Sequence, residues 1–144
     1  MKTLLVVHLL LVGIWLGCVL TEALFERALL GKGRAHELIL VGLHKRVDLI
    51  VELPALLGVL ATGVVLLFSA GASPILQTKI AFGLLAILAN LYCVWLVFRR
   101  ARAATRGDWS QFEVLDHLQH KWGAVVLVGI LVALGLGVRL LGNA

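Results

Sequence analysis

Four long apolar stretches, separated by short polar segments, account for most of the chain. They cover residues of about 3–29, 35–70, 74–103 and 110–141. Each contains the roughly 20 mainly apolar residues that a helix needs to cross the hydrocarbon core of a bilayer. The pattern therefore predicts an all-α, integral membrane four-helix bundle, in which residues 1–144 form a single transmembrane domain.

Two local signals refine the second and fourth helices. Pro54 lies inside the second stretch, and a proline there predicts a kink or a freed backbone carbonyl. Ser110 is followed three residues later by Glu113. This is the capping-box pattern, and it predicts that Ser110 caps the start of the fourth helix.

Small residues recur at intervals that favour close helix packing. The first stretch has Gly13 and Gly17, and the fourth has Gly129, Ala133 and Gly137. Such spacing lets helix backbones approach each other closely in lipid. These faces could pack within the chain or between copies of it, so a homo-oligomer is a candidate assembly.

Composition supports a membrane location, and the basic residues predict an orientation. Apolar residues make up 61% of the chain and charged residues 15%, whereas about a quarter of a soluble domain is charged. Basic residues concentrate around the first and third connections, and the second connection has none before Lys79. Basic loops face the cytoplasm, which places both termini on the outer side of the inner (cytoplasmic) membrane. The net charge of +5 therefore predicts orientation rather than a nucleic-acid partner.

Two nitrogen bases lie at similar depth near the outer side. His8 is in the first helix and Lys79 is in the third, and ionisable groups inside a membrane mark a functional site by default. Across a bundle the pair could ligate a haem iron if the lysine loses its proton. Lys79 could instead extend its amine to the membrane interface. His8 could be a histidine inside the bundle whose ring is simply hydrogen-bonded to neighbouring residues. His8, Trp15 and Glu22 recur every seven residues, so they share one face, which we expect to point inward.

A second layer of ionisable groups lies near the opposite, inner boundary. Carboxylates and imidazoles projecting from three helices are what a metal site in a bundle requires. The alternative is a belt of interfacial polar residues, partly paired with Lys45, Arg46 and Lys121. The layer comprises Glu22, Glu26, His44, Asp48, His117 and His120.

The order of these residues resembles that of the HemJ-type protoporphyrinogen oxidase family and the related copper-resistance D-type membrane domains. The resemblance covers nearly the whole chain. It depends on a first-helix histidine followed by tryptophan and glycine, on a basic residue and then a proline in the second helix, and on a lysine that opens the third. These residues are His8, Trp15, Gly17, Arg46, Pro54 and Lys79.

The resemblance implies a haem b-binding membrane oxidoreductase with His8 as an axial ligand and Lys79 as an important third-helix residue. Arg46 would then be a structural residue or a partner for a haem propionate, and Trp15 would line the pocket. A porphyrinogen and a quinone are the implied substrate and electron acceptor. Ala89 and Asn90 stand where the family has a tyrosine and a histidine.

Three functions therefore remain open. The first is a haem b membrane redox protein, acting in electron transfer or as an oxidoreductase. The second is a membrane protein that binds or transports copper or another divalent metal through His44, His117, His120, Glu22 and Glu26. The third is a cofactor-free small subunit of a membrane complex.

Overall fold

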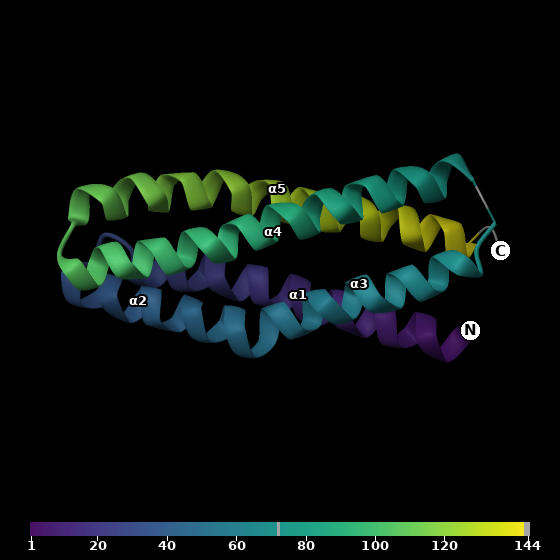
Figure 1. The fold of residues 1–144 in the computed structure, drawn as a ribbon, viewed down its shortest axis with the longest axis horizontal. Coiled ribbons are helices and arrows are strands. Elements are labelled where there is room, and N and C mark those ends of the chain that lie inside the picture. The colour runs from purple at the N-terminus through teal and green to yellow at the C-terminus, as the bar shows by residue number, and fades with distance from the viewer. Residues whose placement is uncertain (72, 143–144) are drawn as a thin grey trace.

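The computed structural model describes residues 1–71 and 73–142, which form four long helical rods packed as a bundle. The rods run along one common axis (Figure 1). The start of α1 and the end of α5 lie at one end, whereas the α1–α2 and α4–α5 connections lie at the other. The elements are α1 (Lys2–Leu29), α2 (Arg34–Val47), η1 (Asp48–Glu52), α3 (Leu53–Phe68), α4 (Pro74–Arg106) and α5 (Trp109–Gly142).

Each rod is long and apolar enough to cross a membrane, and α2, η1 and α3 together form one continuous span over Arg34–Phe68. Large apolar side chains remain exposed on the outside of the bundle, including Phe68 at 86% and Ile50 at 71%. Such a surface suits lipid rather than water. The predicted all-α four-helix bundle is confirmed, and the chain is a multi-pass membrane protein.

The second span changes its helical geometry just before Pro54. Residues Asp48–Glu52 form a π-helical segment, in which the Leu53 N–H donates to the carbonyl of Asp48 five residues back. A proline lacks an N–H, and its ring collides with the carbonyl four residues earlier in a regular helix, so a wider turn relieves the collision. The expected break in α-helical hydrogen bonding is confirmed as a π turn. Both Asp48 and Glu52 are buried there.

The start of α5 differs from the expectation. The helix begins at Trp109, and the Asp108 carboxylate accepts from the Gln111 N–H at 3.1 Å. The prediction that Ser110 caps this helix is therefore wrong. Asp108 takes that role because Gly107, with φ 74°, reverses the chain two residues earlier than the capping-box pattern implies.

Glycines set the close approach of α4 and α5. A Cβ atom at Gly129 would lie 2.9 Å from the Cβ of Ala86, and one at Gly137 would lie 3.0 Å from the Cε of Lys79. Gly129 and Gly137 of α5, the fourth span, therefore pack closely against α4, as predicted. Gly13 and Gly17 differ, since a Cβ at either would meet nothing within 4 Å. Their face of α1 is open within the described chain.

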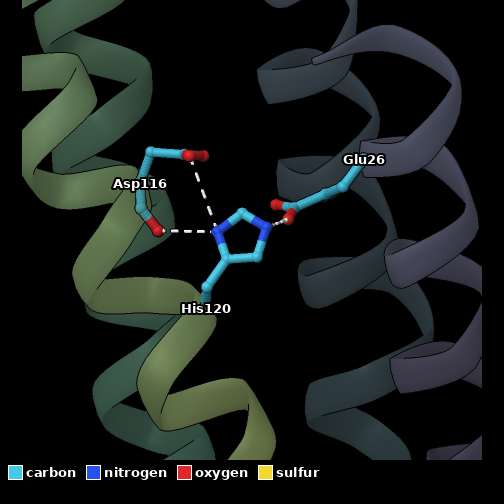
Figure 2. A group of neighbouring side chains, drawn as sticks. All are labelled: Glu26, Asp116 and His120. Atoms are coloured by element: carbon cyan, nitrogen blue, oxygen red, sulfur yellow. Dashed lines mark hydrogen bonds and ion pairs between the residues drawn. The ribbon is translucent and has the colours of Figure 1, made fainter. Parts of the chain in front are cut away.

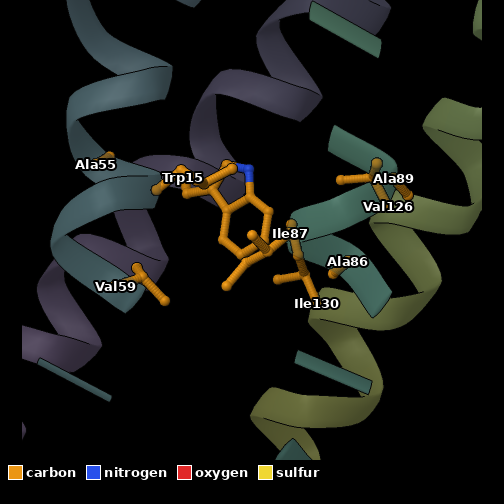
Figure 3. Packing of buried hydrophobic residues seen from close by; sticks show 9 residues of the cluster. Trp15, Ala55, Val59, Ala86, Ile87, Ala89, Val126 and Ile130 are labelled. Carbon is orange, nitrogen blue, oxygen red and sulfur yellow. The ribbon is translucent and has the colours of Figure 1, made fainter. Parts of the chain in front are cut away.

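Trp15 occupies the centre of the bundle. It is 2% exposed and projects from α1 toward Ile87 and Ile130 on the facing helices, as Figure 3 shows. Its indole N–H donates to the Oδ1 of Asn90 at 3.0 Å, which satisfies the one polar atom of the ring. The inward orientation predicted for this face of α1 is confirmed for His8 and Trp15, which are both buried.

The glycine contact generates a test of the packing. Gly129→Ala should lower the free energy of unfolding in detergent by about 1–3 kcal/mol, because a methyl group forced into a filled space strains the helix pair. Gly135→Ala is the matched control on the same helix, since a Cβ there meets nothing within 4 Å. Equal unfolding curves for the two variants would contradict the close contact.

Candidate functional site

A cavity of about 190 Å³, with several polar side chains in a largely apolar wall, lies between the helices. On one side is the apolar cluster around Trp15, and on the other is a second cluster that includes Leu96 and Phe112. We call the polar residues here the polar centre. Its members are Glu22, Glu26, His44, Asp48, Glu52, Asn90, Gln119 and His120, which line the cavity, with Arg100 and Asp116 in contact with them.

Arg100 joins three other helices through its guanidinium group. Its side chain is fully buried. The Nη1 donates to Glu26 of α1 at 2.9 Å and also to Asp116 of α5, while the Nη2 donates to the Nδ1 of His44 of α2 at 2.8 Å. The rigid fork of an arginine suits several acceptors at once. The guanidinium also lies 5.7 Å from the ring centre of Phe112.

His120 lies between Glu26 and Asp116, as Figure 2 shows. Its Nε2 contacts a carboxylate oxygen of Glu26, and its Nδ1 lies 2.9 Å from the backbone carbonyl oxygen of Asp116. Both ring nitrogens face acceptors, so the ring is held as an imidazolium. Arg100 and His120 then supply two positive charges against the two carboxylates of Glu26 and Asp116. We call these four residues the neutral tetrad.

His44 is oriented by the same arginine. Its Nδ1 accepts from Arg100 and also lies 3.3 Å from the Nε2 of Gln119. An arginine only donates, so the neutral His44 ring carries its proton on Nε2 and has no lone pair there for a metal. Gln119, by donating its amide N–H, keeps its Oε1 without a partner in the described structure, and that side chain lines the cavity.

Three further carboxylates form a group that we call the acid triad. Glu22, Asp48 and Glu52 each place one oxygen within 4.8 Å of the others. Asp48 is 1% exposed and Glu52 is 3% exposed. Over residues 1–71 and 73–142, no ion pair reaches any of the three. One oxygen of Glu22 and one of Asp48 are buried without a hydrogen-bond partner there. Charges that are buried and unpaired are costly, so this group needs protons or a cation.

His8 lies apart from the polar centre, on the face of α1 that contacts α3. Its Nδ1 is 2.8 Å from the Oγ1 of Thr62, whose own hydroxyl donates to the carbonyl of Gly58 at 2.6 Å. With the Thr62 proton engaged, His8 donates from Nδ1, and the Nε2 of the neutral ring keeps its lone pair. Gly63 gives the ring room, because a Cβ there would lie 3.4 Å from the His8 Cε1.

Lys79 packs against a different helix. Its Cε lies beside Gly137 of α5, whereas His8 lies beside Gly63 of α3. Within the described residues, no hydrogen bond or ion pair involves Lys79. That the two share an iron therefore stays a prediction.

The other expected site residues divide into two sets. The structure brings Glu22, Glu26, His44 and His120 together at one cavity. His117 and Arg46 are both exposed on their helices and do not line it. Trp15 packs in the apolar core.

Five members of the polar centre are not among the site residues expected from the sequence; one of them, Asn90, entered only as a departure from the HemJ-type pattern. Arg100 belonged to a basic run that predicts orientation, and Asp116 lay in a segment read as interfacial. Glu52 could have been found, since it follows His44 and Asp48 at intervals of four residues, which places all three on one helix face. Gln119 had no signal of its own.

Comparison with protein-family models, curated proteins and solved structures finds no match to this chain. The resemblance to the HemJ-type family stays a prediction. The geometry of the polar centre and of His8 must therefore support the functional argument.

Removing Arg100 tests its part in the bundle. Arg100→Met should cost about 3–5 kcal/mol of unfolding free energy, because it leaves Glu26 and Asp116 with one cation between them in a buried site. Arg99→Met is the control, since Arg99 is exposed and lies over the ring of Trp95. Detergent unfolding of both variants measures the difference. Similar losses would show that Arg100 has no special role.

Proposed function

We propose that the chain is a membrane metalloprotein whose acid triad binds a divalent cation. The observation that carries this proposal is the difference in charge between the two halves of the polar centre. The neutral tetrad holds two cations and two carboxylates in mutual contact. The acid triad holds three clustered carboxylates and has no basic partner within the described residues. A divalent ion would offset most of that charge.

The available donor atoms favour an oxygen-preferring ion. The free oxygens of Glu22 and Asp48, and the Oε1 of Gln119, are buried and have no hydrogen-bond partner among the residues that the structure describes, and all three side chains line one cavity. Carboxylate and amide oxygens suit Mg²⁺, Ca²⁺ or Mn²⁺ better than copper. His44 and His120 support this selection because neither offers a free lone pair: the Nδ1 of His44 accepts from Arg100 and its Nε2 carries the proton, while both nitrogens of His120 face acceptors.

One member of the neutral tetrad, His120, reaches the protein surface. His120 is 44% exposed at its side chain, whereas its partner Glu26 is 11% exposed. Glu26 also lines the cavity. In this proposal the tetrad fixes α1, α4 and α5 around the site, and His120 marks the side from which an ion enters.

Loss of the triad should abolish cation binding. The double variant Asp48→Asn, Glu52→Gln should lose at least ten-fold in affinity for Mn²⁺, because two of three anionic ligands become neutral. Titration of metal-stripped, detergent-purified protein with Mn²⁺, followed by electron paramagnetic resonance of the free ion, measures this directly.

Glu113→Gln is the matched control, since Glu113 is an exposed acid at the bundle surface. It should bind Mn²⁺ as the wild type does. The wild-type protein could instead bind no divalent ion and give the infrared carbonyl band of protonated carboxylic acids, a band that the double variant lacks. That result would reject the metal site and assign protons to the triad.

His8 supports a second candidate function, a haem b membrane redox protein. Its Nδ1–H is held by Thr62, so the ring is oriented with the Nε2 lone pair free. This arrangement is the one by which proteins position a metal-ligating histidine. A haem bound there would supply electron-transfer chemistry, and His8 would hold the iron with Lys79 as a candidate partner. A porphyrinogen substrate and a quinone acceptor remain expectations of the resemblance.

The haem proposal has its own spectroscopic test. His8→Ala should remove the Soret band of the protein purified from cells supplied with haem, and Thr62→Val should shift it by freeing the ring. His36→Ala is the control on an exposed histidine. A colourless wild-type protein, or a His8→Ala variant with its haem spectrum intact, would contradict the assignment.

A further inference from the structure

A basic groove lies on the outside of the bundle, away from the polar centre. It has a volume of about 360 Å³ and lies where the last turns of α4 pack beside α2. Both segments are at the end of the bundle that carries the α1–α2 and α4–α5 connections (Figure 1). Its walls are Lys45, Phe98, Ala101, Arg102, Thr105 and Arg106.

The three cations of this groove have no anionic partner. For the part of the chain that the structure describes, no carboxylate lies within 4.0 Å of Lys45, Arg102 or Arg106. Two other basic groups near this end are paired: Arg34 with two acids, and Arg100 with Glu26 and Asp116 inside the bundle. No acid lines the groove, so the three like charges face one shared space.

The groove also has an apolar side. Phe98 and Ala101 lie among the basic side chains, and the amine of Lys45 is 5.1 Å from the centre of the Phe98 ring. A free inorganic anion would gain nothing from the apolar wall. An amphiphile that presents a phosphate to the cations and its glycerol and first methylenes to Phe98 would use both. Basic pockets between membrane helices bind anionic lipid headgroups in this manner.

We propose that this groove binds the phosphate of an anionic phospholipid from the adjacent leaflet. Lys45 contributes from α2, and Arg102 and Arg106 contribute from α4, one turn apart. The two arginines can each bind phosphate oxygens through two N–H groups. The bound lipid would thereby tie the C-terminal part of α4, the helix that carries Arg100, to α2.

The test uses the full chain in phosphatidylcholine vesicles that contain a trace of spin-labelled lipid. The wild type should immobilise spin-labelled phosphatidylglycerol several-fold more strongly than spin-labelled phosphatidylcholine. The variant Lys45→Gln, Arg102→Gln, Arg106→Gln should lose this preference. Equal immobilisation of both labels by the wild type would overturn the proposal.

A control with the same change of net charge distinguishes lipid binding at the groove from general attraction of anionic lipid by the positive charge of the protein. Arg27→Gln, Lys32→Gln, Lys121→Gln alters three exposed basic residues outside the groove and should keep the preference. A loss in this control as large as in the groove variant would overturn the proposal.

The variant Arg102→Lys, Arg106→Lys keeps the charge and should retain most of the preference. If the triple groove variant does not fold, Arg102→Gln alone should reduce it.

Inorganic phosphate distinguishes the two sources of the anion. At matched ionic strength, replacing chloride with phosphate should leave phosphatidylglycerol bound, because the free ion lacks the apolar contact. Displacement of the lipid by phosphate but not by chloride would assign the groove to the free ion and reject the lipid.

Discussion

The structure depends on one buried guanidinium group. A charge within a membrane bundle is stable only when it is paired and its hydrogen-bonding capacity is used. Arg100 of α4 is paired through both terminal nitrogens, which contact Glu26 of α1, His44 of α2 and Asp116 of α5, while its buried Nε has no partner among the described residues. Each contact crosses to a different helix, so the four rods cannot slide or rotate at this level without exposing an unpaired charge. The glycine contacts between α4 and α5 only set how closely the rods approach.

The same pairing determines which groups remain available for chemistry. Glu26 and Asp116 are neutralised by Arg100 and His120, and His44 gives its acceptor nitrogen to Arg100. What is left at the cavity is a set of oxygens on the acid triad and on Gln119. These contacts occupy the imidazole nitrogens and leave oxygens as the available metal ligands. For this reason we propose an oxygen-preferring ion rather than copper. His8, whose Nδ1–H is held by Thr62, keeps the lone pair of its Nε2.

Periodicity and depth predicted the fold well, and the site in part. The four spans, the inward face of α1 and the layer that gathers Glu22 and His120 all follow from spacing along single helices. Arg100 could not be recognised because an arginine at the end of a span has the same sequence signature whether it enters the bundle or faces the loop. His117 was grouped with His120 since both are near the boundary, yet the rotation of α5 that exposes one and pairs the other is set by contacts between helices.

The neutral tetrad also has a consequence for biosynthesis. Its acids and bases arrive on separate segments: Glu26 is made first, Arg100 enters with the third span, and Asp116 and His120 come only with the fourth. Until the last span is inserted, Arg100 has at most one of its two carboxylates. An unfinished or prematurely released chain would therefore hold Arg100 in lipid without its contact to Asp116, although Glu26 still balances its charge. Such a chain would differ chemically from the finished product, which gives membrane proteases a feature by which to distinguish the two.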